Sequence, residues 1–458
     1  MDNCIRILLI NAINPNIEVE SRYPNLGLGY LVASVHSFLR DKNIIFKIID
    51  DNIHEVSEEF KPHLVGISAV SQNYSIAISL ADYFVSKKIP VVFGGIHITN
   101  LPETLPQSVA LACLGEAEQT FVDIVELFLK DSLIPSKLRE IPGICFWDGN
   151  TLVKTEPRVF ISDMDSIPIP ARDMLPIRPH TYMFTSRGCP YRCEFCSSSR
   201  YWKKLRFFSA EYVVNEIEFL IKNYDISIIS FFDDLFVADI VRVRNIVRLL
   251  KEKNIIGKIR FTCSCRANVV TSDLATLLSE MGVVSVGLGL ESGNEQILQY
   301  LKKDNIQIRD NINAINILKD TNIAVNGSFI IGSPHETKSQ ILDTYKFIKN
   351  SRLDLFDIYI LTPYPGTPIW EYAQNNHVLK TEDITDWSIL DVNVYRNPDK
   401  AIILSKVLSK NEIIALYKKF RRLRLWRNLI KVINHPMRRD IPMMAWRKLK
   451  ECIYDRLH

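Results

Sequence analysis

Long apolar runs are missing from this sequence of 458 residues, although 47% of its residues are hydrophobic. No uninterrupted run approaches the roughly 18 to 20 residues that a membrane-spanning helix requires. The first residues, Met1 to Cys4, also lack the basic region and the cleavage site of a secretory signal peptide. With 24% charged residues, the composition is typical of a globular chain long enough for two or three domains. We therefore expect a cytoplasmic protein.

Cysteines are also few, and most of them are scattered. Six of the nine are spread along the chain, at positions 4, 113, 145, 263, 265 and 452. This distribution argues against a disulfide framework and favours a reducing compartment. Cys263 and Cys265 share one face of a predicted strand, where buried, inert thiols are the commoner outcome.

An excess of positive charge is absent from most of the chain and is concentrated near its end. Residues 418–450 carry twelve Lys and Arg against one acid, Asp440, which is a net charge of +11. Since the whole chain carries +4, the remainder carries −7, which does not favour general nucleic-acid binding. Residues 410–433 place apolar side chains at helical spacing among the basic ones. They predict a C-terminal helix with a solvated basic face, and contact of that face with anionic lipid or an acidic substrate is the alternative.

The three remaining cysteines form one run, Cys189-Pro-Tyr-Arg-Cys193-Glu-Phe-Cys196, directly after the β-prone stretch 182–185. Three thiolates this close can hold three irons of a 4Fe-4S cluster and leave the fourth iron open for chemistry. A tetrahedral zinc site requires a fourth Cys or His nearby, and residues 197–200 offer none. Zinc and incidental clustering remain the alternatives.

The first 130 residues alternate β-type runs with helical ones. We expect strands at 5–10, 44–49, 63–68, 90–93 and 109–113, and helices at 29–39, 76–86 and 117–129. Near-continuous apolar strands separated by helices predict a parallel sheet covered on both faces, a doubly wound α/β domain. Such sheets bind ligands at the carboxyl ends of their strands. The candidate binding residues at these ends are Asn11, Asp50, Ser68, Ser71, Gly94, Gly95, His97, Gly115 and Glu116. For the glycines, a plain strand-to-helix turn is an equally good explanation.

The middle of the chain predicts a domain boundary. Residues 143–156 have the pattern of a β-hairpin, and five prolines between 157 and 179 predict an extended connector. The expected domains are residues 1–142, a hairpin and proline-rich linker at 143–180, a barrel at 181–400 and a basic helical region at 401–458.

A second β/α alternation begins at Thr181. We expect strands at 182–185, 226–232, 258–265, 283–290, 324–331 and 356–361, with helices at 210–223, 239–253, 273–281, 308–320 and 337–350. Six such units predict a partial barrel, whose chemistry lies at the carboxyl ends of the strands. The cysteine run follows the first strand, as that rule requires. The other strand ends carry Asp233, Asp234, Arg266, Glu291, Gly332 and Pro334.

The cysteine run, with the aromatic Phe195 before its last cysteine, resembles the signature of the radical S-adenosylmethionine (SAM) superfamily. The resemblance implies that the open iron binds SAM, and that an electron from the cluster splits SAM into methionine and a 5′-deoxyadenosyl radical. It also implies which residues contact SAM: Phe195 near the adenine, Asp233 or Asp234 at the methionyl amine, Glu291 at the ribose or amine, and Gly332 with Pro334 at the adenine.

These assignments have structural alternatives. Each carboxylate can instead be a helix N-cap or a loop acid, and for Asp234 the two interpretations are close to equally favoured. Arg266 can pair with the carboxylate of SAM or with a substrate anion.

Four stretches of the first half resemble the cobalamin-binding domain of cobalamin-dependent radical SAM enzymes. In order, before the cysteine run, they are Pro24–Leu31, Val65–Ser68, Phe93–His97 and Leu114–Glu118, and the match spans about residues 5–130. The resemblance implies an N-terminal doubly wound, Rossmann-like cobalamin-binding domain, then a partial (βα)6 radical SAM barrel and C-terminal helices.

The sequence departs from that family in one motif. Many cobalamin domains carry D-x-H-x-x-G, whose histidine ligates cobalt, whereas this chain has Lys61-Pro-His63-Leu-Val-Gly66. A lysine replaces the acid that orients the imidazole, and His63 opens a strand, at the end opposite the ligand. We expect cobalamin to be bound without His63. A degenerate domain that binds no cobalamin is the alternative.

The resemblance implies methylation of an unactivated carbon of a small-molecule or lipid-like substrate, with the methyl group taken from methylcobalamin. Ring closure or another radical rearrangement is the alternative within the family, and a non-catalytic iron-sulfur or corrinoid sensor or carrier is the alternative of another class. Methylthiolation of tRNA is disfavoured, because Cys4, Cys113 and Cys145 do not cluster in sequence. Expected partners are the substrate and an electron donor such as flavodoxin or ferredoxin, with no nucleic acid, and membrane contact through the basic helix as an option.

Overall fold

The computed structural model describes residues 4–14, 24–130, 133–391 and 400–432. The chain divides into two compact units, each built from several segments. The first unit comprises residues 1–182, 196–225 and 363–391, and the second comprises residues 183–195, 226–362 and 392–458. The chain therefore returns to the first unit twice after leaving it.

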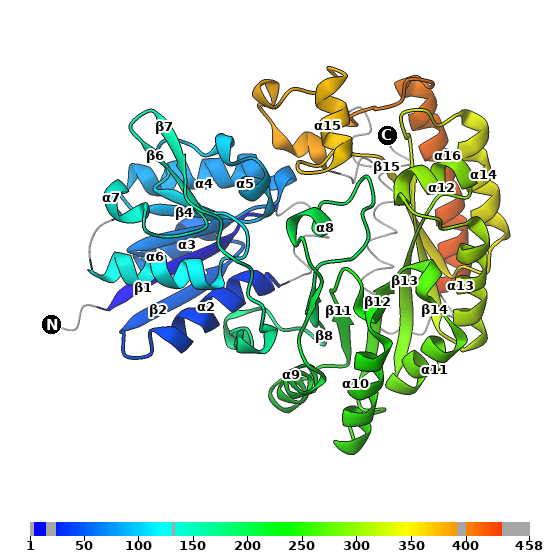
Figure 1. Ribbon diagram of the computed structural model, residues 1–458, viewed down its shortest axis with the longest axis horizontal. Coiled ribbons are helices and arrows are strands. Elements are labelled where there is room, and N and C mark those ends of the chain that lie inside the picture. The colour runs from blue at the N-terminus through cyan, green and yellow to red at the C-terminus, as the bar shows by residue number, and fades with distance from the viewer. Residues whose placement is uncertain (1–3, 15–23, 131–132, 392–399, 433–458) are drawn as a thin grey trace. The chain divides into compact units, whose positions relative to one another are not determined.

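A seven-stranded sheet forms the centre of the first unit (Figure 1). Its order is β2-β1-β3-β4-β5-β6-β7, in which β1 to β5 are parallel and the hairpin β6–β7 is added antiparallel. The strands are β1 (Ile5–Asn11), β2 (Ile44–Ile49), β3 (Leu64–Ser68), β4 (Val91–Gly94), β5 (Leu111–Cys113), β6 (Ile144–Asp148) and β7 (Thr151–Lys154). The doubly wound α/β fold is confirmed. The strand order reverses between β1 and β3, where sheets of this order bind ligands.

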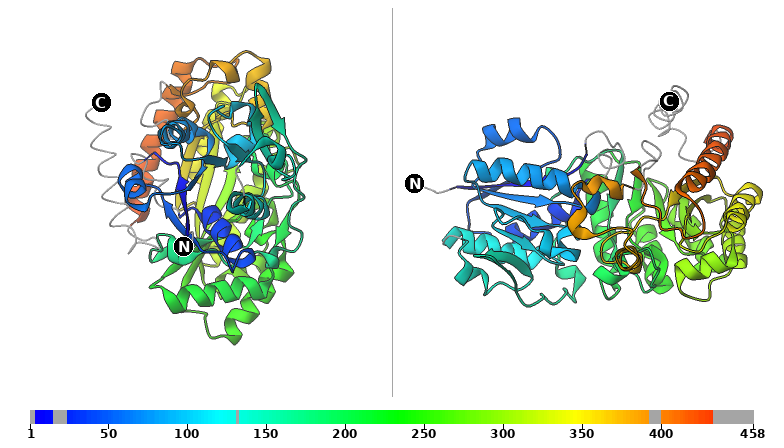
Figure 2. Two further views of the ribbon diagram at one scale, coloured as in Figure 1. Left: turned by 90° about the vertical axis from the view of Figure 1, so that its left-hand side faces the viewer. Right: turned by 90° about the horizontal axis from the view of Figure 1, so that it is seen from above.

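Helices cover both faces of this sheet (Figure 2). On one face α2 and α6 pack together, and Leu28 and Val32 of α2 share a core with Phe121 and Val125 of α6. On the other face α4 contacts β3 and β4. The helices of this unit are α2 (Leu26–Phe38), α3 (Ile53–Phe60), α4 (Tyr74–Ser86), α5 (Ile96–Asn100), α6 (Glu118–Lys130), α7 (Pro135–Leu138), α8 (Ser198–Tyr201), α9 (Ala210–Asn223) and α15 (Pro368–Asn375).

A six-stranded sheet of consecutive strands dominates the second unit. Its order is β15-β14-β13-β12-β11-β8, and β11 to β15 are parallel. The strands are β8 (His180–Met183), β11 (Ile228–Phe231), β12 (Arg260–Cys265), β13 (Val283–Glu291), β14 (Ala324–Ile331) and β15 (Leu355–Ile360); the short strands β9 (Ser186–Arg187) and β10 (Arg206–Phe207) lie outside this sheet. The predicted partial barrel is confirmed, and all carboxyl ends of β11 to β15 lie at one edge.

The connecting helices lie along one side of this sheet (Figure 1). They are α10 (Ile240–Glu252), α11 (Ser272–Met281), α12 (Glu295–Lys302), α13 (Ile308–Asp320) and α14 (Lys338–Asn350). Side-chain oxygens of Asp239, Thr271, Asn294 and Thr337 cap α10, α11, α12 and α14. Each helix therefore begins where a residue can satisfy its first free N–H groups.

The predicted C-terminal helix is present as α16 (Lys410–Val432) and packs on the barrel. Arg424 pairs with Asp357 of β15 at 2.7 Å, and Phe420 meets Tyr345 of α14 edge to face. The remaining basic residues, 433–450, lie outside the described residues. In the described ranges, none of the helices combines the length and the apolar character needed to cross a bilayer.

Candidate active site

Polar side chains meet at the carboxyl ends of β1 and β3. Asn11 ends β1 and is in register with Ser68, which ends β3. Asn11 Oδ1 accepts a hydrogen bond of 2.8 Å from Nδ2 of Asn25, the N-cap of α2. Asp50 follows the adjacent strand β2, and burial, with a smaller contribution from Asp51, raises the pKa of its carboxyl group. Three of the predicted binding residues therefore lie along one edge of the sheet.

The ends of β4 and β5 leave open space above the backbone. A Cβ atom added at Gly94 or Gly115 would meet no atom within 4 Å. Gly95 has a φ of 102°, and a Cβ there would lie 2.5 Å from the carbonyl oxygen of Ala69. Thr99 Oγ1 accepts a hydrogen bond of 3.1 Å from the N–H of Gly115. A bulky ligand can therefore approach the backbone closely at these two strand ends.

His97 is fully buried in an aromatic cluster. Its ring stacks on Tyr74 with centroids 3.7 Å apart and meets Trp387 edge to face at 4.4 Å. Nε2 lies 3.2 Å from Thr104 Oγ1, and burial lowers the pKa of the imidazole to about 3. Ser71 is also buried. His97 therefore takes part in the aromatic packing next to the end of β4.

Glu116 has a partner that the sequence did not suggest. Its carboxylate accepts hydrogen bonds from Arg206 Nη1 at 2.9 Å and Nη2 at 3.1 Å, and from the N–H of Ile161 at 2.8 Å. The two charged side chains are 4% and 10% exposed. Glu116 therefore fixes two neighbouring segments beside β5, whereas we expected it to offer a free carboxylate to a ligand.

His63 lies where the sequence places it, directly before β3 at the amino end of the strand. The backbone N–H of Arg6 donates to Nδ1 at 3.0 Å, and Arg6 Nη2 lies 3.0 Å from Nε2. Burial, then Arg6, lowers the pKa of this imidazole. Both ring nitrogens are thus occupied, at the end of the sheet opposite the polar residues.

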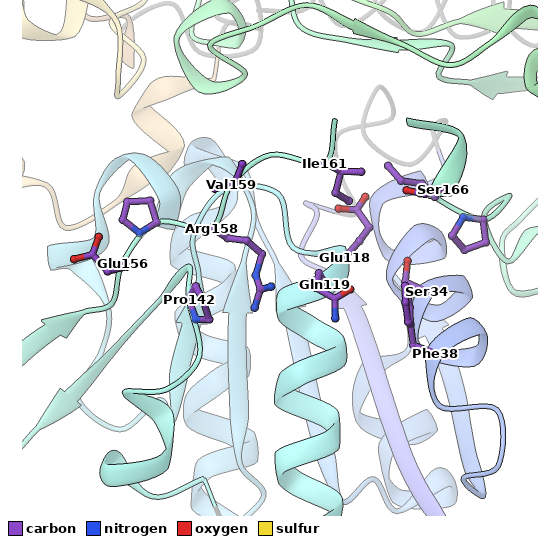
Figure 3. Close-up of a pocket in the computed structure, with 13 residues that line it drawn as sticks. Ser34, Phe38, Glu118, Gln119, Pro142, Glu156, Arg158, Val159, Ile161 and Ser166 are labelled. Atoms are coloured by element: carbon purple, nitrogen blue, oxygen red, sulfur yellow. The ribbon is translucent and has the colours of Figure 1, made fainter. Parts of the chain in front are cut away.

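A cavity of about 480 Å³ lies elsewhere in the first unit, between α2, the start of α6 and the segment 156–168 (Figure 3). Arg158 extends toward α6, where Nε donates to Thr120 Oγ1 at 2.8 Å and Nη2 pairs with Asp123. None of the candidate binding residues at the strand ends lines this cavity, so we assign it no part in the site at the strand ends. Its lining consists of Ser34, Phe38, Glu118, Gln119, Pro142, Glu156, Pro157, Arg158, Val159, Ile161, Ser166, Ile167 and Pro168.

The cysteine run follows β8 and β9; Cys189 and Cys193 belong to the second unit, and Cys196 begins the segment 196–225 of the first. None of the three cysteines forms a disulfide; Cys193 is buried, and Cys189 and Cys196 are half-buried. Burial is the largest of several causes that raise the pKa of the Cys189 thiol. The loop is anchored at Glu194, whose N–H donates to the carbonyl oxygen of Leu301 at 2.9 Å. The end of α12 therefore holds the loop that carries the cysteines.

Arg266, at the end of β12, reaches this loop directly. Its Nη1 donates to Sγ of Cys193 at 3.3 Å, and its guanidinium lies 3.9 Å from the centre of the Tyr191 ring. Nη2 pairs with Asp304, and the Arg266 side chain is 6% exposed. The structure thus gives Arg266 a thiol and an acid as partners, where we expected the carboxylate of SAM or a substrate anion.

The two aspartates after β11 differ sharply in environment. Asp233 is buried and accepts hydrogen bonds from the Thr185 N–H and from Ser186 Oγ, both at 2.6 Å. It also lies 3.8 Å from Arg242 Nη2, and burial raises its pKa against the opposing effect of Arg242. Asp234 is exposed. Of the two predicted amine ligands, Asp233 is therefore committed within the protein, and Asp234 is the accessible carboxylate.

Glu291 ends β13 with a φ of 57° and is also paired internally. Its Oε1 lies 2.8 Å from Lys302 Nζ of α12, and the two side chains are 6% and 5% exposed. A Cβ at Gly289 would lie 2.6 Å from the same Oε1, so a larger residue there would require the Glu291 carboxylate to shift. The predicted ribose or amine contact of Glu291 would compete with Lys302.

The turn after β14 is fixed by an acid. Glu336 Oε2 accepts hydrogen bonds from the N–H of Gly332 at 2.7 Å and of Ser333 at 3.1 Å. Glu336 is fully buried, its Oε1 has no partner among the described residues, and burial raises its pKa to about 7. The carbonyl oxygen of Pro334 accepts a hydrogen bond of 2.8 Å from the N–H of Lys406.

Phe195, which the sequence predicts near the adenine, is half-buried.

Within the described ranges, no three His, Cys, Asp or Glu side chains converge on one point that could hold a single metal ion. A 4Fe-4S cluster does not need such convergence, because each thiolate binds a different iron.

Both halves of the chain match the models of known protein families. Residues 183–348 match the model of the radical SAM superfamily, and residues 16–125 match that of the B12 binding domain. A methyltransferase of Pyrococcus horikoshii, described as uncharacterized, is 33% identical over 404 residues, which cover 84% of this chain and 86% of the relative. The chain belongs to the cobalamin-dependent radical SAM enzymes.

Other members of these enzymes are more distant. The anaerobic magnesium-protoporphyrin IX monomethyl ester cyclase of Cereibacter sphaeroides is 24% identical over 440 residues, covering 86% of this chain and 70% of the cyclase. The solved structure of the radical SAM methyltransferase TsrM from Kitasatospora setae, with tryptophan and a SAM analogue bound, aligns with a TM-score of 0.67 and 18% identity. It covers 82% of this chain and 77% of TsrM, and at this identity it shows a shared fold.

As a cobalamin-dependent radical SAM enzyme, the protein uses a 4Fe-4S cluster, SAM and cobalamin. The residues present fit these groups. The cysteine run supplies three cysteines that are not in disulfides, and the open space at Gly94 and Gly115 suits a bulky ligand at the ends of β4 and β5.

Sequence reasoning missed four residues that support these strand ends: Lys302, Asp304, Glu336 and Trp387. Three of them had a signal. Lys302 and Asp304 follow a short amphipathic pattern at 297–301 that predicts a helix close behind the Glu291 strand end. Glu336 stands four residues after Gly332, within reach of free N–H groups in a turn. We find no sequence signal that links Trp387 to His97.

Proposed function

We propose that the protein methylates a carbon centre of a small molecule. The observation that carries this proposal is the 33% identity, over most of both chains, with a methyltransferase. When bound, the cofactors supply one-electron cleavage of SAM and a transferable methyl group. The chain's own residues hold and orient these groups and the substrate, and exclude water.

In this proposal Cys189, Cys193 and Cys196 hold the cluster through their thiolates. Asp234, as the exposed carboxylate at the end of β11, binds the ammonium group of SAM, while Asp233 fixes the backbone at Thr185. Phe195 and the turn of Gly332 and Pro334 contact the adenine. This role for the turn is supported by Glu336, which holds its backbone in one conformation.

The cobalamin site is proposed at the carboxyl edge of the first sheet. Two features support it: polar side chains at the ends of β1, β2 and β3, and open space next to the backbone at the ends of β4 and β5. The residues that bind are Asn11, Asp50, Ser68, Gly94, Gly95 and Gly115. Ser71, His97 and Glu116 are buried and support this edge from behind.

A second candidate function is radical ring closure. It is favoured by the 24% identity to the cyclase over 86% of this chain. The two reactions differ in the fate of the methyl group of SAM. Only methyl transfer places that group in the product.

The test is to incubate anaerobically reconstituted enzyme with a reductant, SAM labelled in its methyl group and an extract of small molecules. We expect one new product that carries the label. Consumption of SAM with formation of 5′-deoxyadenosine, and a changed product without label, would instead support ring closure or rearrangement.

The proposal also includes an electron donor, a cellular location and a surface for membrane contact. An electron donor such as flavodoxin or ferredoxin reduces the cluster. None of the eight cysteines in the described part of the chain forms a disulfide, which supports a reducing, cytoplasmic location. For a lipid-like substrate, α16 offers a surface: Lys418, Arg422 and Trp426 lie exposed at helical spacing, and Trp426 is 72% exposed. Sedimentation with anionic but not with neutral vesicles is expected, and Trp426→Ala with Arg422→Glu should abolish it.

A further inference from the structure

We propose that Arg266 is a positioning residue that raises the reduction potential of the cluster by donating a hydrogen bond to the Cys193 thiolate. The inference rests on the proposed role of Cys193 as a cluster ligand. It goes beyond that role, because it assigns to Arg266 an effect on the cluster before SAM binds.

The contact is direct. Arg266 Nη1 lies 3.3 Å from Sγ of Cys193 and is oriented to donate to it. Arg266 follows β12, and 73 positions separate it from Cys193, so the contact exists only in the folded barrel. Both residues are buried.

The guanidinium is held in place from two other sides. Asp304 pairs with Nη2, and the ring of Tyr191 lies against the guanidinium at 3.9 Å. A planar group fixed by an acid and an aromatic face loses little further freedom when it donates a third interaction. The hydrogen bond to Cys193 is therefore preorganised.

The loop that carries Cys193 is also held in place, by contacts of the neighbouring Glu194. The N–H of Glu194, next to Cys193, donates to the carbonyl oxygen of Leu301 at 2.9 Å. The Glu194 carboxylate lies 3.6 Å from Lys303 Nζ. Since Asp304 directly follows Lys303, the same short segment fixes both the thiol and its donor.

The direction in which Arg266 shifts the reduction potential of the cluster follows from charge. Reduction adds a negative charge to the cluster, and a nearby N–H donor on a cation stabilises the reduced state more than the oxidised one. Asp304 opposes this effect but is 29% exposed, against 6% for Arg266, so water screens the acid more strongly. The net effect of Arg266 and Asp304 is a higher reduction potential of the cluster.

The test is a redox titration, followed by electron paramagnetic resonance, of anaerobically reconstituted enzyme without SAM. We expect Arg266→Gln to shift the midpoint to a more negative value at unchanged iron content. Arg266→Lys keeps the charge without the planar donor geometry, and we expect an intermediate shift. Arg244→Gln is the control, because Arg244 forms an exposed pair with Asp273 at 3.0 Å; its midpoint should equal that of the wild type.

Wild-type midpoints for both Arg266 variants would overturn the inference, and would leave SAM as the partner of Arg266. Loss of the cluster from both variants would overturn it as well, since a residue that only tunes the cluster is not needed for its assembly. Cys193→Ala separates this result from failure of the cluster site itself. If that variant keeps a wild-type cluster, the proposed ligand assignment is wrong, whatever Arg266 does.

Discussion

The rings of His97 and Trp387 meet edge to face with their centroids 4.4 Å apart. Trp387 lies in the segment 363–391, which follows the last strand of the second sheet but belongs to the first unit. The same segment is attached by Asn100 Nδ2, which donates to the carbonyl oxygen of Pro365 at 3.0 Å. The segment thus covers a side chain directly behind the proposed cobalamin edge.

Removal of the Trp387 side chain should destabilise the first unit. Trp387 is 4% exposed, so we expect Trp387→Ala to lower the free energy of unfolding by about 3 to 5 kcal/mol. Trp426→Ala is a matched control, because Trp426 is 72% exposed, and it should change the value by less than about 0.5 kcal/mol. Urea unfolding followed by circular dichroism measures both. Equal effects of the two substitutions would contradict the packing role of Trp387.

Glu336 predicts a pH dependence of stability. Burial raises its pKa from 4.5 to about 7 in the folded protein, so the folded state keeps a proton that the unfolded chain releases earlier. This contribution to stability is fully present below about pH 4.5 and is lost as the pH rises through about 7, with a total of about 3 kcal/mol. Glu336→Gln cannot ionise. Its urea midpoint should therefore fall less than that of the wild type between about pH 5 and about pH 8.

The exposed Glu371 provides the control, since Glu371→Gln should leave the wild-type pH dependence unchanged. A Glu336→Gln profile parallel to that of the wild type would show that Glu336 ionises normally in the fold.

Asp233 and Asp234 should separate into a structural and a binding residue. Asp233→Asn weakens charged hydrogen bonds to Thr185 and Ser186, and we expect a loss of about 2 kcal/mol in stability. Asp234→Asn should leave stability within about 0.5 kcal/mol and weaken SAM binding, measured by equilibrium dialysis of reconstituted enzyme. Normal SAM affinity in the Asp234 variant would remove that residue from the site.

A fully buried ion pair in the first unit gives a test by double substitution. Arg172 Nη2 lies 2.5 Å from Glu216 Oε1, and both side chains are 0% exposed. Arg172→Met strands a buried carboxylate and should cost about 3 to 5 kcal/mol. Adding Glu216→Leu removes the stranded group, so the double variant should recover part of that loss. A double variant less stable than Arg172→Met would contradict this account of the pair.

The sequence predicted most of the long elements because their patterns are local. Helix α13 and strand β14 have the predicted bounds, 308–320 and 324–331. Helix α2 begins three residues before the prediction, since Asn25 caps it and accepts the N–H of Leu28. The short helices α3 and α5 were missed, because five to eight residues hold too few turns for a clear period. Helix α12 was missed although residues 297–301 carry an amphipathic pattern.

At the site, the sequence predicted residue types but not their partners. The spacing of Cys189, Cys193 and Cys196 is local and was sufficient to indicate a cluster. Asp233 is buried because it accepts a hydrogen bond from the N–H of Thr185, 48 positions away, which only the fold brings near. The same limit applies to Glu116, whose partner Arg206 lies 90 positions away.

The central claim is that the chain has two cofactor sites: the cysteine run holds an iron-sulfur cluster that acts on SAM, and the first sheet binds cobalamin. It is tested most directly by anaerobic reconstitution of the wild type and of Cys193→Ala, reading iron, corrinoid absorption and 5′-deoxyadenosine together. We predict roughly four irons per chain and SAM cleavage in the wild type, and corrinoid uptake without SAM cleavage in the variant. An iron-free wild type, or a variant that still cleaves SAM, would contradict the account.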